Sequence, residues 1–317
     1  SANEQQSTAK QYPNIITVVN ETFADIKVLG DFKTNEDYMP YFHSLKKNCV
    51  TGYTYASIVG GQTANTEFEL LTGNTLGFLS AGTTAFQLYI HGQMPSLVSN
   101  LKAEGYSGNK AMHPFNPYNY NRPAVYKDFG FTDFIDKFDF PKNVKRVREY
   151  ISDEANVDRI ISEYEKNRKK TDQPFYMYNM TIQNHSPYDK DAANFKQPIK
   201  IESSKYDAEA NRYLNLIKYS DDSLKQLTSY FERCKEPTII LFLGDHQPRL
   251  TDEFMNKITN GQYQTWSSEQ MMKRYQVPFV IWANYDIKGQ HIEKTSMNYI
   301  QSILTQTAGV KMTGYQR

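Results

Sequence analysis

Four side chains able to bind a metal ion or move a proton directly follow short apolar segments. They are Glu21, His185, Asp245 and His246, which come after residues 15–19 (IITVV), 175–182 (FYMYNMTI) and 238–243 (TIILFL). Two carboxylates and an imidazole are suitable ligands for a divalent cation such as Mn²⁺ or Zn²⁺. The plain structural alternative is a turn at Asp245 and a helix cap at Glu21.

A candidate nucleophile, the hydroxyl of Thr63, lies in the segment 60–71 (GGQTANTEFELL). The pattern predicts a glycine-rich loop that opens a helix, with Thr63 at the helix N-terminus. Free N–H groups and the helix dipole favour an anionic group there. A hydroxyl close to a divalent cation can lose its proton and attack phosphorus or sulfur. Without the metal candidates, the simpler interpretation of Thr63 is an N-cap.

Three further residues are candidates for substrate binding and proton transfer. His185, in the sequence NHSPY, has a side chain suited to general acid or base catalysis near neutral pH. Arg122 could bind a phosphate through its guanidinium fork, and His113 lies nine residues before it. Composition alone would make the loop that carries His113 and Arg122 an ordinary surface loop.

The segments that position these residues predict an α/β fold. The three apolar runs and a fourth at residues 277–282 (VPFVIW) are apolar throughout, as in strands buried on both faces of a parallel sheet. Apolar residues at helical spacing predict helices over residues 94–104, 144–170 and 206–231, with another near 296–308. The chain is therefore expected to form a doubly wound, mostly parallel sheet sandwiched by helices, with ligands outside the carboxyl ends of the strands.

Composition limits the class of protein. The 317 residues include 36 Lys and Arg against 35 Asp and Glu, a net charge of +1 that argues against a nucleic-acid partner. Residues 1–11 are expected to be a flexible tail or linker remnant, and residues 12–317 one catalytic domain whose portion from about 277 could form a small subdomain. Cys49 and Cys234 are either free thiols or one disulfide.

Four motifs in order resemble one known family. They are residues 14–23 (NIITVVNETF), 61–68 (GQTANTEF), 184–188 (NHSPY) and 244–248 (GDHQP). Together they resemble the extracellular catalytic domain of lipoteichoic acid synthases and related phosphoglycerol transferases, which are sulfatase-like members of the alkaline phosphatase superfamily. The resemblance covers approximately residues 12–310 and implies that family's α/β fold.

The resemblance assigns roles to individual residues. It implies that a manganese ion, with Mg²⁺ or Zn²⁺ as alternatives, is held by Glu21, Thr63, Asp245 and His246. Thr63 is then also the nucleophile. The residues implied for the glycerol-phosphate pocket are His185, Arg122, His113 and Tyr120, the last standing where the synthases have a tryptophan.

Two departures from the family leave the acceptor open. Phe115 stands where the synthases have an acidic pocket residue, and Leu250 stands where they have a serine that contacts substrate. The amino-acid sequence around Thr63 is closer to that of relatives that add glycerol phosphate to wall polysaccharides. The Cys/Ser-x-Pro-x-Arg sequence from which sulfatases form their nucleophile is absent at Thr63, so sulfate ester hydrolysis is disfavoured.

The resemblance also predicts an activity and a location. We expect transfer of glycerol phosphate from phosphatidylglycerol, through a covalent bond to Thr63, to a teichoic-acid chain or a wall polysaccharide. The alternatives are a glycerophosphodiester hydrolase with the same site and a catalytically silent wall-glycan binding protein. The expected place is the extracellular face of the cell membrane of a Gram-positive-type bacterium, with membrane-spanning helices outside this sequence.

Overall fold

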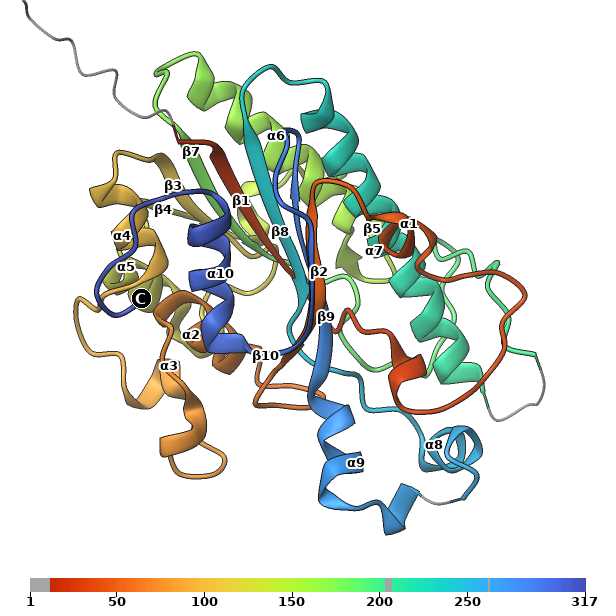
Figure 1. The fold of residues 1–317 in the computed structure, drawn as a ribbon. Coiled ribbons are helices and arrows are strands. Elements are labelled where there is room, and N and C mark those ends of the chain that lie inside the picture. The colour runs from red at the N-terminus through yellow and green to blue at the C-terminus, as the bar shows by residue number, and fades with distance from the viewer. Residues whose placement is uncertain (1–11, 203–206, 262) are drawn as a thin grey trace, which may run out of the picture.

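The computed structural model describes residues 12–202, 207–261 and 263–317, and its centre is one eight-stranded sheet (Figure 1). The strands in spatial order are β10 (Gln290–Ser296), β2 (Cys49–Tyr55), β9 (Gln276–Ala283), β8 (Thr238–Gly244), β1 (Asn14–Asn20), β7 (Phe175–Met180), β3 (Ser107–Met112) and β4 (Asp133–Ile135). Among these strands β9 alone runs antiparallel to its neighbours. The predicted doubly wound, mostly parallel α/β fold is confirmed.

The fourth apolar run forms β9, so its uniform burial did not indicate a parallel direction. β9 lies between β2 and β8 and is covered on both faces. Residues in such a central strand are buried whichever way the strand runs. The edge strand β10, which pairs with β2, was not predicted from the sequence, because its segment QHIEKTS is polar and mostly exposed.

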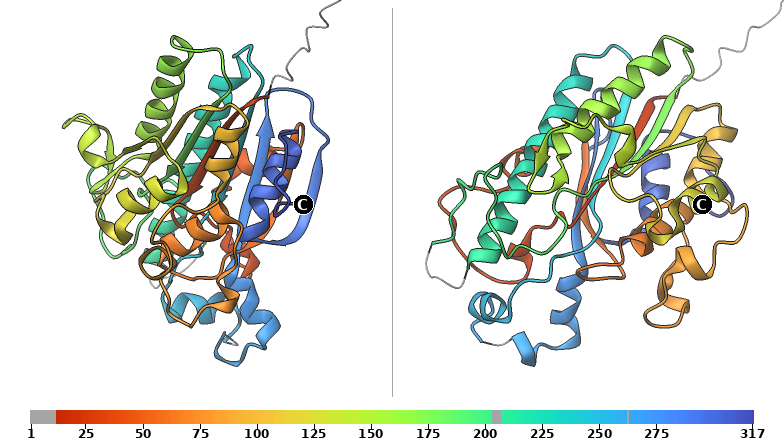
Figure 2. Two further views of the ribbon diagram at one scale, coloured as in Figure 1. Left: turned by 90° about the vertical axis from the view of Figure 1, so that its left-hand side faces the viewer. Right: turned by 180° about the vertical axis from the view of Figure 1, so that it is seen from behind.

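Two layers of helices enclose the sheet (Figures 1 and 2). One layer contains α1 (Pro40–Ser44), α6 (Asp153–Arg168) and α7 (Ala208–Glu232), and the other contains α2 (Thr63–Thr72), α4 (Leu97–Ala103), α5 (Arg122–Phe129) and α10 (Ile300–Thr307). Successive residues of β8 alternate between two apolar clusters, with Ile240 and Phe242 in one and Leu241 and Leu243 in the other. The apolar runs therefore supply both cores at once.

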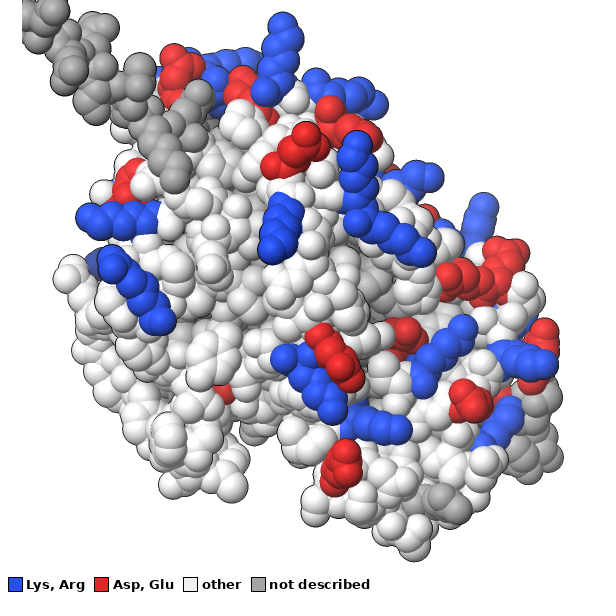
Figure 3. Space-filling view, viewed as in Figure 1, with Lys and Arg blue, Asp and Glu red and all other residues white. Residues whose placement is uncertain are grey.

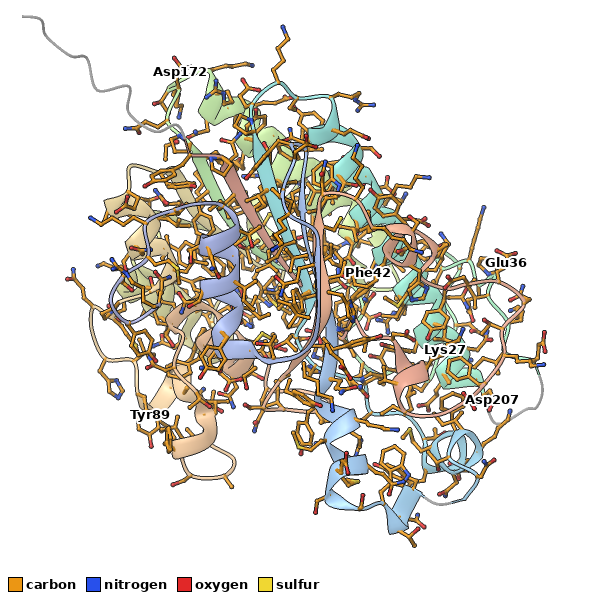
Figure 4. The ribbon with its side chains drawn as sticks, in the orientation of Figure 1. Lys27, Glu36, Phe42, Tyr89, Asp172 and Asp207 are labelled. Carbon is orange, nitrogen blue, oxygen red and sulfur yellow. The ribbon has the colours of Figure 1, made fainter. Side chains whose placement is uncertain are left out.

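Three short helices lie in connections near the carboxyl ends of the strands. α3 (Ala85–Leu88) follows α2, whereas α8 (Asp252–Ile258) and α9 (Ser268–Met272) lie between β8 and β9 at the lower end of the molecule in Figure 1. Figure 4 labels Tyr89, beside α3, and Phe42 of α1, whose ring packs edge-on against Phe23 with 5.7 Å between ring centroids. Phe23 follows β1, so this contact anchors the turn that leaves the sheet there.

The predicted helices are confirmed with one correction. The predicted helix over 94–104 contains α4, and the one over 206–231 corresponds to α7, which ends one residue later at Glu232; the chain leaves α4 through Gly105 at φ +88°. The prediction of a helix over 144–170 is wrong in its first part, where β5 (Arg146–Val147) and β6 (Tyr150–Ile151) form a hairpin. α6 begins only after Ser152, whose hydroxyl accepts a hydrogen bond from the backbone N–H of Ala155 and caps the helix.

The two cysteines are not bridged. Cys49 is buried in β2, Cys234 follows α7, and both are free thiols. Within the described ranges, no helix combines the length and the apolar character that a bilayer-spanning segment needs.

Candidate active site

The carboxyl ends of β1 and β8 bring the predicted metal ligands together. The two strands pair in parallel with Asn20 opposite Gly244, so Glu21 and Asp245 leave the sheet side by side. Ligand atoms of Glu21, Asp245 and His246 all lie within 4.8 Å of one another, and all three side chains are buried. The expectation that these residues meet at one sheet edge is therefore met by the geometry.

A close backbone approach holds this arrangement. A Cβ atom on Gly244 would lie 1.8 Å from the carbonyl oxygen of Phe23, so only glycine allows the two strand ends this near. The backbone N–H groups of Thr22 and His246 then donate to Asp245 Oδ1 at 2.6 and 2.8 Å. These two bonds fix the carboxylate and turn Asp245 Oδ2 toward the cluster.

The unpaired atoms of the cluster fit a divalent cation. His246 donates from Nδ1 to the carbonyl of Gln247 at 3.0 Å, which leaves Nε2 as the ring nitrogen that can bind a metal ion. That nitrogen lies 3.2 Å from Asp245 Oδ2, and both atoms are buried without a hydrogen-bond partner among the described residues. Two acceptors facing each other repel unless a cation lies between them. Burial and the nearby charge of Glu21 raise the pKa of Asp245 to about 6.

Thr63 faces this cluster from the first position of α2. Its Oγ1 lies 3.5 Å from Glu21 Oε2. The N-cap position belongs to Gln62, which adopts a left-handed conformation and makes no side-chain capping bond, so Thr63 is not the cap. No side chain caps this helix end, and although the Asn65 N–H donates to the carbonyl of Gln62 at 2.8 Å, the N–H groups of Thr63 and Ala64 at the helix start are placed to bind an anion.

One cavity of about 320 Å³ joins Thr63 to the other predicted residues. Its wall includes Glu21, Thr63, His113, Phe115, Tyr120, Arg122, His185 and His246. Asp245 lies beneath the wall with no exposed surface. Leu250, where the synthases have a substrate-contacting serine, lines a neighbouring groove instead.

His185 is held with one ring nitrogen available. Its Nδ1 lies 2.7 Å from the carbonyl oxygen of Ser186, to which it donates, and 3.4 Å from the hydroxyl of Tyr150. The ring also stacks on Phe115 with 6.3 Å between centroids. Nε2 is therefore the nitrogen of His185 that can exchange a proton with a substrate.

Arg148, which the sequence analysis did not single out, fixes the backbone around His185. Its guanidinium donates to the carbonyl oxygens of Gln183, His185 and Pro187 at 2.8, 2.7 and 2.7 Å. Arg148 lies at the turn of the β5–β6 hairpin with φ +54°. The two turn residues, Arg148 and Glu149, are not those that mark a tight hairpin turn, so no local pattern in the sequence indicated this hairpin.

Arg122 is positioned by a second unpredicted residue, Glu67. Arg122 donates from Nη2 and Nε to Glu67 Oε1 at 2.6 and 3.1 Å, and both side chains are buried. Tyr126 and Tyr178 donate to the other oxygen, Oε2. The signal in the sequence was spacing, since Glu67 follows Thr63 by four residues and so shares its face of α2.

The remaining pocket residues surround Arg122. Its guanidinium lies over the ring of Tyr120, 5.2 Å from the centroid. His113 is buried, and its Nδ1 donates a hydrogen bond to the carbonyl oxygen of Met180 at 3.0 Å. Burial and the charge of Arg122 hold the pKa of His113 well below its usual value, so this imidazole is neutral.

The sequence and the fold place the chain in the sulfatase family. The family's sequence profile, described as Sulfatase, matches residues 13–310, and the chain belongs to that family. This assignment confirms the sulfatase-like part of the resemblance found in the motifs.

Relatives narrow the resemblance within the family. A Rhizobium meliloti (strain 1021) protein named for cyclic β-1,2-glucan modification is 32% identical over 98% of this chain and 48% of its own length. The lipoteichoic acid synthase-like protein YvgJ of Bacillus subtilis (strain 168) is 27% identical over 74% of this chain and 36% of its own length. The chain thus spans about half or less of these curated relatives. They support the prediction of a lipoteichoic acid synthase-like phosphotransferase domain.

A solved structure supports the fold. The Streptococcus pyogenes phosphoglycerol transferase GacH, in complex with sn-glycerol-1-phosphate, aligns with a TM-score of 0.79 at 20% identity. The alignment covers 97% of this chain and 77% of that chain. At this identity the likeness concerns the arrangement of the backbone.

Proposed function

We propose that the chain is the catalytic domain of a metal-dependent phosphoglycerol transferase that acts at the outer face of a cell membrane. The donor is phosphatidylglycerol, and the acceptor is a glycerol-phosphate polymer or a cell-surface glycan. The observation that carries the proposal is the Thr63 hydroxyl, 3.5 Å from Glu21 in a buried cluster of cation ligands at a helix N-terminus. The names of YvgJ and GacH support the reaction class.

The cation would be held by Glu21, Thr63, Asp245 and His246, whose hard oxygen and imidazole donors suit Mn²⁺ and also admit Mg²⁺ or Zn²⁺. When bound, it supplies positive charge that favours the ionised form of the Thr63 hydroxyl and offsets charge on the phosphate oxygens.

In the first step, Thr63 Oγ1 reacts in its ionised form and bonds to the phosphorus of phosphatidylglycerol. The bond from phosphorus to the diacylglycerol oxygen breaks, and the electron pair stays on that oxygen. His185 Nε2 donates the proton that converts the leaving oxygen to a hydroxyl. Arg122 and the first-turn N–H groups of α2 bind the non-bridging oxygens, on which charge develops.

In the second step, an acceptor hydroxyl attacks the same phosphorus and gives its proton to His185. The bond from phosphorus to Thr63 Oγ1 breaks, and the electron pair returns to that oxygen. The product carries glycerol phosphate on the acceptor, and both Thr63 and His185 are restored. Water in place of the acceptor would release free glycerol phosphate.

Intact-protein mass spectrometry tests the proposal directly. The wild type and Thr63→Ala are each incubated with Mn²⁺ and phosphatidylglycerol. We expect a glycerophosphate adduct on the wild type alone, because Thr63 Oγ1 is the atom that carries the glycerophosphate group between the two steps. Thr63→Ser is the matched control and should keep the adduct, since it keeps the hydroxyl.

The other outcomes separate the alternatives. Turnover that persists in Thr63→Ala would refute the covalent mechanism. Release of glycerol phosphate that no acceptor suppresses would identify a hydrolase. A wild type without adduct, release or Mn²⁺ binding would identify a silent scaffold.

A further inference from the structure

A groove of about 650 Å³ adjoins the catalytic cavity, and nothing in the mechanism above uses it. The two hollows share Gly60, Gly61 and Gln62, the loop that directly precedes Thr63. The far wall comes from residues 249–252, 263 and 271–275, in the connection that carries α8 and α9. In Figure 3 the lower border of the molecule is hollowed between the lobe of α3 and the lobe of α8 and α9.

Two arginine side chains in this groove have no acidic partner among the described residues. Arg249 and Arg274 form no ion pair and no hydrogen bond through their side chains among the described residues. The stem of Arg249 covers Gly60, where an added Cβ would lie 2.2 Å from Arg249 Cγ. Gly60 in turn donates its N–H to the carbonyl of Gln247 at 2.9 Å, so the groove and the nucleophile loop are one connected structure.

Aromatic rings complete the wall. The Arg274 guanidinium lies 5.3 Å from the ring centroid of Tyr263, and Trp266 supports the same ring edge-on, also at 5.3 Å. Tyr275 lies further along the groove. Rings with a polar edge beside planar hydrogen-bond donors present apolar and polar surface together, as the two faces of a sugar ring require.

The groove also holds one carboxylate, which the hydroxyl groups of a glycan can use as a hydrogen-bond acceptor and a phosphate group cannot. Asp252 lies in the same wall as the two arginines and has no ion-pair partner among the described residues. A phosphate polymer would meet this carboxylate as well as the guanidinium groups. A polyhydroxyl ligand can instead donate to Asp252 and accept from Arg249 and Arg274.

We propose that this groove binds a sugar unit of a neutral glycan, which presents a hydroxyl to the glycerophosphate carried by Thr63. The inference rests on the proposed function and selects the glycan from its two acceptor classes. The shared loop 60–62 places the groove beside the phosphorus that the acceptor must attack. The name of the Rhizobium relative, which refers to a cyclic glucan, agrees with this class of acceptor.

Half-reaction kinetics test this inference. The glycerophosphate adduct is first formed with Mn²⁺ and phosphatidylglycerol and then discharged with either cyclic β-1,2-glucan or a glycerol-phosphate oligomer. We expect the glucan to discharge the wild-type adduct faster than the oligomer does. In the double variant Arg249→Gln, Arg274→Gln the ratio of the glucan step to the donor step should fall at least tenfold.

The matched control is Arg233→Gln, which removes an exposed arginine that follows α7 at the opposite end of the sheet. It should leave both steps at wild-type rates. Discharge by the oligomer alone or by neither acceptor, or a double variant with an unchanged ratio, would overturn the inference and leave the transferase proposal standing. A wild type that forms no adduct would instead refute the proposed function.

Discussion

Thr63 and Glu67 lie one helical turn apart on α2, and this spacing links the proposed nucleophile to Arg122, the proposed phosphate-binding residue. Glu67 holds Arg122 through two hydrogen bonds, while Thr63 faces the ligand cluster. Because residues four apart share a helix face, the orientation of α2 sets both side chains together. The site therefore depends on a buried carboxylate that contacts no substrate itself.

Glu67→Gln tests this dependence. The change keeps the shape of the side chain but leaves the buried Arg122 charge without a counter-ion, which costs about 3–5 kcal/mol when one partner of a buried pair is removed. We expect a lower free energy of unfolding and a fall in kcat/KM for phosphatidylglycerol of at least tenfold. Urea unfolding and steady-state kinetics at several donor concentrations measure the two effects.

Glu69→Gln is the matched control on the same helix. Glu69 is also buried, but it accepts hydrogen bonds from Ser57 and the backbone N–H of Leu76 at 2.8 and 3.0 Å and contacts no arginine. Its substitution should change stability and leave KM at the wild-type value. Equal effects of the two variants on KM would contradict a positioning role for Glu67.

The sequence pointed to the side chains that form the candidate site more readily than to those that hold them in place. Glu21, Asp245 and His246 follow apolar strands, so their meeting could be predicted from the strand pattern alone. Glu67 and Arg148 act through partners far away in sequence, Arg122 and the loop of His185. Such pairs depend on tertiary packing, which no local pattern specifies.

At the scale of elements, the β5–β6 hairpin determines how His185 is presented. The hairpin turn places Arg148 against three carbonyl oxygens of the loop that follows β7. Tyr150, from the same hairpin, approaches the imidazole. The general acid and base thus lies between a strand end and a small hairpin, and each of them limits its motion.

Arg148→Ala should loosen this loop. Hydrogen bonds from a charged donor contribute about 1.5–3 kcal/mol each, but these carbonyls are partly accessible to water, which replaces some of the loss. We expect kcat to fall about tenfold with a smaller change in donor KM, because His185 acts in the chemical steps. Single-turnover rates of adduct formation measure the effect.

Arg146→Ala is the control within the same hairpin. Arg146 is exposed, and among the described residues its side chain donates to the carbonyl of Glu149 alone, in the hairpin itself, at 2.9 Å. Its loss should leave the rate of adduct formation near that of the wild type. An equal loss of rate in both variants would mean that hairpin stability, and not the loop contacts of Arg148, controls His185.

The same hairpin explains why the fold was predicted only in part. Residues 144–152 carry apolar side chains at spacings that also fit a helix, and two-residue strands are too short to show alternation. The long elements behaved differently. β8 and α7 bury enough apolar surface for their period to be read without tertiary information.

At the scale of the whole molecule, the sheet concentrates negative charge at one buried point while the visible surface mixes both signs (Figure 3). Glu21 lines the cavity and Asp245 lies beneath it. The register of β1 and β8 holds the two carboxylates close enough to repel each other. The metal-free protein must therefore accept either a strained carboxylate pair or a bound proton. A bound cation offsets the repulsion between the carboxylates without a proton, so metal binding should raise the free energy of unfolding.

Metal-free protein should lose stability as pH rises, and Mn²⁺ should restore it. The pKa of Asp245 is about 6 in the folded protein against 3.8 ordinarily, so the folded state binds this proton more tightly. Its stabilisation is full below about pH 4 and is lost as pH rises to about 6, a change on the order of 3 kcal/mol. At pH 7, Mn²⁺ at 100 times its Kd should return about 2.7 kcal/mol. Urea unfolding at pH 4 and pH 7 with chelator, and at pH 7 with Mn²⁺, measures both changes.

Two asparagine variants separate the metal site from burial in general. Asp245→Asn should weaken the pH dependence and lose most of the Mn²⁺ stabilisation, because it removes both a titrating group and a ligand. Asp221, buried between α1 and α7, also has a pKa raised to about 6, but it accepts hydrogen bonds from the N–H groups of Tyr41 and Phe42 far from the cluster. Asp221→Asn should therefore change the pH dependence and keep the full Mn²⁺ effect. If Asp245→Asn retained that effect, the cation would be held elsewhere, and the proposed role of the strand ends would be wrong.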